Sequence, residues 1–475
     1  MNQTNVTDLG LGSRKIRLLV TIASYGLKNL DLLKRIIHRY HSMTIDVDVV
    51  VVSNEPKELD GVKVVVGLPS KNPWSLPFAH KPIFAQNIDK YDLFAYSEDD
   101  MEVTEENIHS FLRATNDLAQ DEIAGFLRYE VDKFGIWSLP EVHGRYYWKP
   151  ESVKQRGNYT IAEFTNEHAA FYLLTQAQLR QAIASGGFLR PPYEGRYDML
   201  CTAATDPYTS CGFRKVICIS AVEDFLIHHL SDRYTGQFGV SLSIVKEQIH
   251  TQIAIAKGIH PVSNLFRAES LMLDGEWSKN YYEQPCEDLL KLVPYNTKSI
   301  LSIGCGWGAT EAKLKERGAI VTALPMNSIF GAMAARLGID VIYGSLEECL
   351  EKLNGRTFDC VIMTDLLHLL PNPEQVVEPC SHFVRQGGTF VISGPNFGSV
   401  RMLVKCALGM GDYKKLHNFN ESGVYMLGPT VLKGYLKRSG LSIASLRWLN
   451  GMSKSGIERK LGGLGADNWI LQAHR

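Results

Sequence analysis

The sequence contains no long hydrophobic run. No stretch of about 18 consecutive apolar residues occurs in its 475 residues, so we expect no helix that spans a membrane. The first residues, MNQTNVTDLGLGSRKIR, also lack the apolar core of a secretory signal. Both absences predict a cytoplasmic protein.

The sequence also lacks a surplus of charge. Lys and Arg number 50 against 51 for Asp and Glu, which gives a formal net charge of −1. Because binding to a phosphate backbone requires a basic surplus, we expect no nucleic-acid partner. Hydrophobic residues at 45% and charged residues at 21% are typical of globular proteins, and the length predicts more than one domain.

The cysteines lack any pairing pattern. There are nine, an odd number, and no two are spaced as Cys-x-x-Cys. This argues against a disulfide framework and against a zinc site. Scattered single cysteines are typical of reduced thiols in the cytoplasm.

The sequence does contain two series of alternating strands and helices, which predict two α/β domains. Near-continuous apolar strands indicate sheets that are buried on both faces. Between the two series, roughly from 255 to 285, apolar periodicity is weak, so we place the domains at 1–264 and 265–475. The expected strands are 16–24, 47–53, 62–66 and 92–97 in the first series, and 299–303, 319–323, 340–343, 358–363 and 388–393 in the second.

A glycine-rich turn follows the first strand of the second series. Gly304, Gly306 and Gly308 let the backbone turn sharply and approach a nucleoside without a Cβ in the way. With its flanks, YYEQPCEDLLKLVPYNTKSILSIGCGWG, and with the segments 358–373 and 387–396, this turn resembles class I S-adenosylmethionine-dependent methyltransferases. The resemblance implies a Rossmann-like C-terminal domain with S-adenosylmethionine as its cofactor.

The chain departs from this family at three carboxylate positions. Ser302 stands where an acid is usual in the first strand, Pro325 where an acid grips the ribose, and Ser345 near the expected adenine-side Asp. A hydrogen bond to a charged group contributes roughly 1.5–3 kcal/mol, so we expect weak cofactor binding. Both an active methyltransferase and a retained scaffold remain open.

The resemblance also assigns roles to individual residues of the C-terminal domain. The glycines, Asn327 and Asp365 would bind the cofactor, and Asn327 would compensate in part for the missing acids. His368 would face the site together with Asp365. His417 is the candidate general base for an acceptor hydroxyl, because a neutral imidazole titrates near neutral pH.

In the N-terminal domain, Glu98, Asp99 and Asp100 follow an apolar strand directly. Consecutive carboxylates at the carboxyl end of a strand favour a hard divalent cation, so they predict a Mn²⁺ or Mg²⁺ site. The alternative is that these acids cap the following helix. His250 is the candidate third ligand, and His228 and His229 compete with it.

A second acidic pair, Glu223 and Asp224, lies at the expected start of a helix. Together with the triple acid, it resembles GT-A-type glycosyltransferases, either exostosin-like or of the inverting bacterial family. In the inverting case Asp224 would be the general base; in the retaining case it would orient the acceptor. The resemblance also implies a nucleotide-sugar site at the end of the first strand. Its residues are Thr21, Ala23, Ser24, Tyr25 and Arg128, although Arg128 pairs equally well with Glu130.

The sequence therefore predicts a metal-dependent glycosyltransferase fused to a methyltransferase-like domain. Its partners would be a nucleotide-sugar donor and a glycan or glycolipid acceptor, and a glycolipid would allow peripheral membrane association. The first alternative is a methyltransferase whose N-terminal domain recognises glycan. The second is a non-enzymatic scaffold for polysaccharide assembly.

Overall fold

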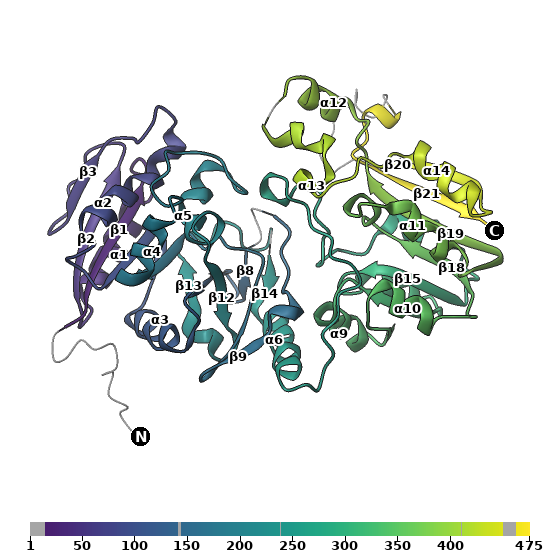
Figure 1. The fold of residues 1–475 in the computed structure, drawn as a ribbon, viewed down its shortest axis with the longest axis horizontal. Coiled ribbons are helices and arrows are strands. Elements are labelled where there is room, and N and C mark those ends of the chain that lie inside the picture. Colours follow the sequence, from purple (N-terminus) through teal and green to yellow (C-terminus); the bar gives the residue numbers. More distant parts are fainter. Residues whose placement is uncertain (1–14, 141–143, 238, 410, 450–461) are drawn as a thin grey trace. The chain divides into compact units, whose positions relative to one another are not determined.

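The protein divides into two compact units in a computed structural model, which describes residues 15–140, 144–237, 239–409, 411–449 and 462–475 (Figure 1). The first unit comprises Met1–His143 and Tyr147–Ile249; the second comprises Gly144–Tyr146 and His250–Arg475. The domain boundary expected at 264/265 thus falls inside the second unit, near its start. No helix of the described residues is long and apolar enough to cross a membrane.

The first unit is built on a mixed five-stranded sheet with the order β11-β4-β1-β2-β3. Its four parallel strands confirm the expected ones, and β11 runs antiparallel to β4. Residues 18–24 of β1 are all buried, as a sheet covered on both faces requires. The strands are β1 (Arg17–Ser24), β2 (Asp46–Ser53), β3 (Lys63–Val66), β4 (Leu93–Glu98) and β11 (Phe171–Thr175).

Two smaller sheets complete the first unit, in the orders β6-β12-β10-β9 and β14-β8-β7-β13-β5. Their strands are short and lie between loops, so the hydrophobic pattern of the sequence does not predict them. They consist of β5 (Met101–Glu102), β6 (Glu122–Ala124), β7 (Leu127–Val131), β8 (Trp137–Leu139), β9 (Lys154–Arg156), β10 (Tyr159–Ala162), β12 (Arg214–Cys218), β13 (Leu226–His229) and β14 (Val240–Ser241).

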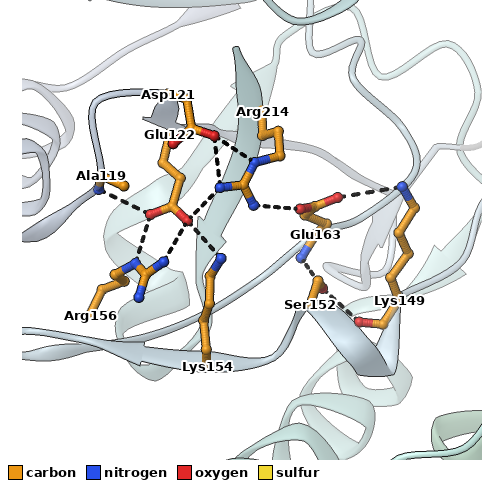
Figure 2. A network of polar contacts seen from close by, with 9 residues as sticks. All are labelled: Ala119, Asp121, Glu122, Lys149, Ser152, Lys154, Arg156, Glu163 and Arg214. Carbon is orange, nitrogen blue, oxygen red and sulfur yellow. Dashed lines mark hydrogen bonds and ion pairs between the residues drawn. The ribbon is translucent and has the colours of Figure 1, made fainter. Parts of the chain in front are cut away.

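A charged network joins three strands of one of these sheets (Figure 2). The side chain of Glu122, on β6, is fully buried. It accepts hydrogen bonds from Arg156 Nε on β9 (3.0 Å), from Arg214 Nη2 on β12 (3.0 Å) and from the Ala119 N–H (3.1 Å), and Lys154 Nζ lies 2.8 Å away. Although burial would raise the pKa of Glu122, its hydrogen bonds with Arg156 and Lys154 lower it to about 2. The carboxylate is therefore ionised and held by cations.

The second unit is built on a seven-stranded sheet with the order β17-β16-β15-β18-β19-β21-β20. The five strands expected from the sequence are present and parallel, and β21 and β20 add an antiparallel edge. The predicted Rossmann-like fold of this region is thereby confirmed. The strands are β15 (Ser299–Cys305), β16 (Ile320–Pro325), β17 (Asp340–Val341), β18 (Phe358–Met363), β19 (Val384–Pro395), β20 (Ser442–Leu449) and β21 (Asn468–His474).

Helices and 3₁₀ segments connect the strands. In the first unit these are α1 (Leu30–His41), α2 (His80–Gln86), α3 (Glu105–Asp117), α4 (Gln176–Ala184), α5 (Met199–Thr209), the 3₁₀ segment η3 (Ile219–Phe225) and α6 (Leu242–Ala256), whose end belongs to the second unit. In the second unit they are α7 (Glu287–Leu290), α8 (Ala309–Glu316), α9 (Ser328–Arg336), α10 (Leu346–Lys352), α11 (Pro373–Ser381), α12 (Val400–Ala407), η6 (Gly411–His417), α13 (Phe419–Ser422) and α14 (Pro429–Arg438).

Each main sheet reverses its strand order once. After β3, the chain returns to the other side of β1 to form β4; after β17, it returns to the other side of β15 to form β18. Ligands of open α/β sheets bind outside the carboxyl ends of the strands at such a reversal. The candidate sites are therefore the ends of β1 and β4 in one unit and of β15 and β18 in the other.

Candidate functional sites

The glycine turn lies at the end of β15, as predicted. Gly304 and Gly308 have φ values of +76° and +90°, a region that favours glycine. A Cβ on Gly304 would lie 2.6 Å from Leu366 Cδ2, and one on Gly306 would lie 2.4 Å from the Tyr281 carbonyl oxygen. These glycines therefore make room for the close approach of the chain's own residues at the strand end.

Three side chains that the sequence analysis did not single out carry charge at this turn: Lys279, Glu283 and Glu311. Glu283 Oε1 accepts a hydrogen bond from the Gly306 N–H (3.1 Å), and Glu311 Oε1 accepts one from Ser302 Oγ (2.6 Å). Lys279 is buried and donates to the Thr364 carbonyl oxygen (2.8 Å) after β18. The turn is thus flanked by carboxylates and one cation.

These charges influence one another. Burial raises the pKa of Glu283 to about 7; the charge of Lys279 lowers it, and the charges of Glu311 and Asp365 raise it. Glu283 Oε2 and Glu311 Oε2 are buried atoms without a hydrogen-bond partner. Two carboxylate oxygens therefore remain available for a donor at this strand end.

The end of β16 differs from the family pattern in the way that the sequence predicted. Pro325 is its last residue, and its side chain offers neither charge nor hydrogen-bond acceptor. Asn327, expected to compensate, instead caps α9: its side chain accepts hydrogen bonds from two backbone N–H groups of that helix. Residues 326–328 also form backbone hydrogen bonds with 263–265. The side-chain oxygen of Asn327 is thus already used by the fold.

The other predicted residues of this unit occupy different environments. Asp365 follows β18 with φ of +46°, and its Oδ1 accepts a hydrogen bond from Ser393 Oγ (3.0 Å). His368 is buried, and its Nε2–H donates to the Trp277 carbonyl oxygen (2.7 Å). Burial lowers the pKa of His368 to about 4, so the ring is neutral at pH 7. His417 is exposed at the end of η6.

In the first unit, the three consecutive acids lie at the end of β4 but make separate contacts. Asp99 Oδ1 accepts a hydrogen bond from Asn29 Nδ2 (2.8 Å), and Asp100 Oδ2 accepts one from His229 Nε2 (3.0 Å). Burial raises the pKa of Glu98 to about 7 and that of Asp99 to about 6. Asp99 and Asp100 thus have different hydrogen-bond partners, while the charges of the neighbouring acids raise the pKa values of Glu98 and Asp99.

The predicted metal centre of Glu98, Asp99, Asp100 and His250 is not supported. Within the described ranges, no group of three or more His, Cys, Asp or Glu side chains is arranged to hold a metal ion. Asp100 is instead paired with His229, and His250 is exposed on α6. Sequence reasoning gave the acids one common role because they are adjacent in the chain, whereas their side chains reach different partners.

The predicted helix at Glu223 and Asp224 is wrong. Both residues lie in η3, and the apolar residues that follow form β13. Glu223 is exposed and pairs with Lys246 (2.6 Å). Asp224 precedes the amino end of β13, whereas His229, which contacts Asp100, lies at its carboxyl end. The residue that the fold brings to the acids is therefore His229.

His229 joins two carboxylates that lie far apart in the sequence. Its Nε2 faces Asp100, and its Nδ1 lies 2.6 Å from Glu130 Oε1; all three side chains are buried. Burial alone would lower the pKa of His229, but the hydrogen bonds to Asp100 and Glu130 raise it. The sequence analysis had named His229 and Asp100 as candidates for one metal site but not Glu130, which lies on another strand, β7.

The predicted nucleotide-sugar residues lie at the end of β1. Thr21, Ala23 and Ser24 are buried, and Tyr25 is exposed just beyond the strand. Arg128, on β7, is only 6% exposed, and its Nε and Nη2 have no hydrogen-bond partner. Glu130 therefore pairs with His229 rather than with Arg128.

The fold and the glycine turn of the second unit define a Rossmann-like domain with a charged site at the reversal of its strand order. Its sequence matches the methyltransferase domain family over residues 301–392. That range runs from β15 to β19 and includes the turn, the helix with Glu311, and Asp365. The site of the second unit therefore lies inside the range that is similar to a methyltransferase domain.

Among known proteins, the chain is similar to ubiquinone biosynthesis O-methyltransferases. The protein of Pseudomonas entomophila is 29% identical over 172 residues, which are 31% of this chain and 74% of that protein. The protein of Azotobacter vinelandii is 27% identical over 165 residues, which cover 31% and 66% of the two chains. Both matches cover about a third of this chain, and neither describes the chain as a whole.

Solved structures give a likeness of fold. A SAM-dependent methyltransferase from Archaeoglobus fulgidus has a TM-score of 0.31 at 17% identity and covers 40% of this chain and 92% of its own. Magnesium protoporphyrin IX methyltransferase from Synechocystis has a TM-score of 0.30 at 17% identity and covers 40% and 79%.

The family match and the similar proteins support methyl transfer, and with it the first of the alternatives weighed from the sequence, better than they support the main prediction. They give no support to a glycosyltransferase domain, to manganese or magnesium, or to polysaccharide synthesis. Glycosyl transfer by the first unit stays a prediction from its sequence motifs.

Proposed function

We propose that the second unit transfers a methyl group from S-adenosylmethionine to an oxygen atom. The observation that carries this proposal is that the matched range 301–392 places its glycine turn at the strand reversal between β15 and β18. The name of the similar proteins supports oxygen as the acceptor.

The charges of the site fit such a cofactor at its amino-acid end. S-adenosylmethionine carries a sulfonium, an ammonium and a carboxylate, and the site offers the buried side chains of Glu311 and Lys279 together with the carboxyl group of Glu283. The fit is poorer at the ribose, where Pro325 replaces the usual acid. The methyl group is supplied by the cofactor, so the chain's own residues act by holding and orienting the two reactants.

Isothermal titration of the full chain with S-adenosylmethionine and S-adenosylhomocysteine tests this proposal. We expect saturable one-to-one binding of both, and transfer of labelled methyl to a hydroquinone or to a glycoside hydroxyl, offered separately. Absence of binding to either ligand would contradict the proposal and favour a scaffold. His417→Ala with unchanged turnover would remove His417 as the general base.

The first unit has a second candidate function, the predicted transfer of a sugar from a nucleotide-sugar. The observation in its favour is Arg128, a buried guanidinium with two unpaired nitrogens whose charge acts on Glu98 at the end of β4. Buried N–H groups that make no hydrogen bond are costly, and an anionic ligand such as a diphosphate would accept from them.

A thermal shift with UDP-glucose or GDP-mannose, each with and without Mn²⁺, tests this second function. Ligand at 100 times its Kd stabilises the folded protein by about 2.7 kcal/mol. We expect the shift to be lost in Arg128→Gln and kept in Arg180→Gln, since Arg180 forms an exposed pair with Asp89. A panel of nucleotide-sugars that gives no shift in the wild type would contradict this function.

A further inference from the structure

The acid that similar methyltransferases carry in their first strand is absent from this chain, yet the strand end is not without carboxylates. Ser302 occupies the acid's position within β15 and is buried. Its hydroxyl donates to Glu311 Oε1 at 2.6 Å. Glu311 belongs to the first turn of α8, the helix that follows the glycine turn. The carboxylate of Glu311, on the helix, therefore lies beside Ser302, the uncharged residue of the strand.

Glu311 is unusual for an acid in the first turn of a helix. Such residues are commonly exposed and favoured by the helix dipole, whereas Glu311 is only 3% exposed. Its Oε2 is buried and has no hydrogen-bond partner. Burying a carboxylate with an unpaired oxygen is costly, so a donor or a cation is expected to occupy the space beside it.

A second carboxylate reaches the turn from the segment that precedes β15. Glu283 Oε1 receives the Gly306 N–H at 3.1 Å, and Trp307 Nε1 donates to the Glu283 carbonyl oxygen at 2.6 Å. These two contacts hold Glu283 over the turn. Its Oε2 is buried and unpaired, like that of Glu311.

The charge around these two oxygens is negative on balance. The negative charges of Glu311 and Asp365 both act on Glu283, and Lys279 is a cation that acts on it in the opposite direction. Lys279 is itself committed to the carbonyl oxygen of Thr364. A ligand group that brings positive charge and several N–H donors would relieve both the repulsion and the two unpaired oxygens.

We propose that Glu283 and Glu311 together bind the α-ammonium group of S-adenosylmethionine and replace the missing carboxylate of β15. This inference rests on the proposed methyltransferase function, because it assigns the residues that hold its cofactor. The ammonium donates hydrogen bonds to Glu283 Oε2 and Glu311 Oε2. The methionine end then compensates for the weak ribose contact at Pro325.

The experiment compares ligands that differ in this one group. Glu283→Gln and Glu311→Gln keep the side-chain shape and can still accept from Gly306 and Ser302, but they lose the charge. Titration of the full chain is expected to show at least tenfold weaker binding of S-adenosylhomocysteine in each variant. Binding of 5′-methylthioadenosine, which lacks the amino-acid group, is expected to remain within about twofold of its wild-type value. Glu287→Gln, an exposed acid on α7, is the matched control and is expected to bind both ligands normally.

The pH dependence provides a second measurement. Because the pKa of Glu283 is raised to about 7 in the absence of ligand, the wild type is expected to bind S-adenosylhomocysteine about tenfold more weakly at pH 6 than at pH 7.5. Glu283→Gln is expected to lose this dependence.

The outcomes are distinguishable. Normal binding of S-adenosylhomocysteine by both Gln variants would overturn the inference and leave the proposed function intact. Equal losses for S-adenosylhomocysteine and 5′-methylthioadenosine would also overturn it, because they would indicate a general disturbance of the turn. A wild type that binds neither S-adenosylmethionine nor S-adenosylhomocysteine would refute the proposed function, and the inference with it.

Discussion

Removing the buried charge of Glu122 tests how much its ion pairs stabilise the sheet β6-β12-β10-β9 of the first unit. In Glu122→Gln, one neutral acceptor replaces a carboxylate that pairs with Lys154, Arg156 and Arg214 (Figure 2). The variant leaves three cations around a neutral side chain. Breaking one side of a buried pair is costly, because the remaining charge loses its partner. Arg214 keeps its pairs with Asp121 and Glu163, so the loss falls mainly on Lys154 and Arg156.

The magnitude follows from the pKa of Glu122. The difference between its ordinary value of 4.5 and about 2 corresponds to about 3.4 kcal/mol of stability. The three cations are roughly one-third exposed, so water screens part of this interaction. We therefore expect Glu122→Gln to reduce the free energy of unfolding by about 2 kcal/mol at pH 7.

The sign of the pH dependence is fixed by the lowered pKa. Stability from Glu122 is fully present above about 4.5, its pKa in the unfolded chain, and is lost as the pH falls toward about 2. By pH 3.5 about two-fifths of it is lost. The difference in the free energy of unfolding between the wild type and Glu122→Gln is expected to become smaller by the same fraction.

Scanning calorimetry of the full chain at pH 7 and pH 3.5 measures this effect. A loss of about 2 kcal/mol lowers the transition temperature of a unit of this size by about 4–8 °C, and the transition of the second unit serves as an internal reference. Asp89→Asn, which removes an exposed pair with Arg180, is the control and is expected to change little. A change below about 0.5 kcal/mol in Glu122→Gln, or one that is the same at both pH values, would refute the reasoning.

Three further predictions concern other parts of the molecule. Gly306→Ala is expected to weaken S-adenosylhomocysteine binding at least tenfold, because its Cβ would lie 2.4 Å from a carbonyl oxygen; Gly428→Ala, with open space around it, is the control in the same titration. His229→Gln is expected to lower the transition temperature more at pH 6 than at pH 9. The pKa of His229 is raised in the folded state, so its contribution is complete below about 6.5 and is lost as the pH rises through the folded value; equal losses would contradict this. Asp206→Asn leaves the buried Lys81 unpaired and is expected to cost about 3–5 kcal/mol in urea unfolding; a cost under 1 kcal/mol would contradict it.

The sequence predicted the two main sheets well because their strands are buried on both faces. A strand such as β1 must be apolar along nearly its whole length, and this leaves a clear run of branched residues. The glycine turn was equally visible, because a positive φ at Gly304 and Gly308 favours one residue type. Short strands that lie between loops carry no such signal, and η3 and β13 were therefore taken for a helix.

The sites were predicted less well, because their members meet only in three dimensions. Three adjacent acids at the end of β4 predicted one metal centre. In the structure, Asp100 forms a hydrogen bond with His229, and Asp99 forms one with Asn29. Ser302, expected to stand in the place of a family acid, lies within β15 and donates to Glu311. Its neighbour Glu311, nine residues later, could not be assigned from spacing alone.

The α/β architecture, the place of the glycine turn and the position of Pro325 at the end of a strand could be predicted from the sequence. These features depend on local chemistry: burial pattern, backbone freedom and the identity of one residue at a strand end. The tertiary structure alone decided which charges share a site. Glu283, Glu311 and Lys279 lie on separate segments, and only packing brings their charges close enough to interact, because electrostatic coupling depends on distance in space and on burial rather than on order in the chain.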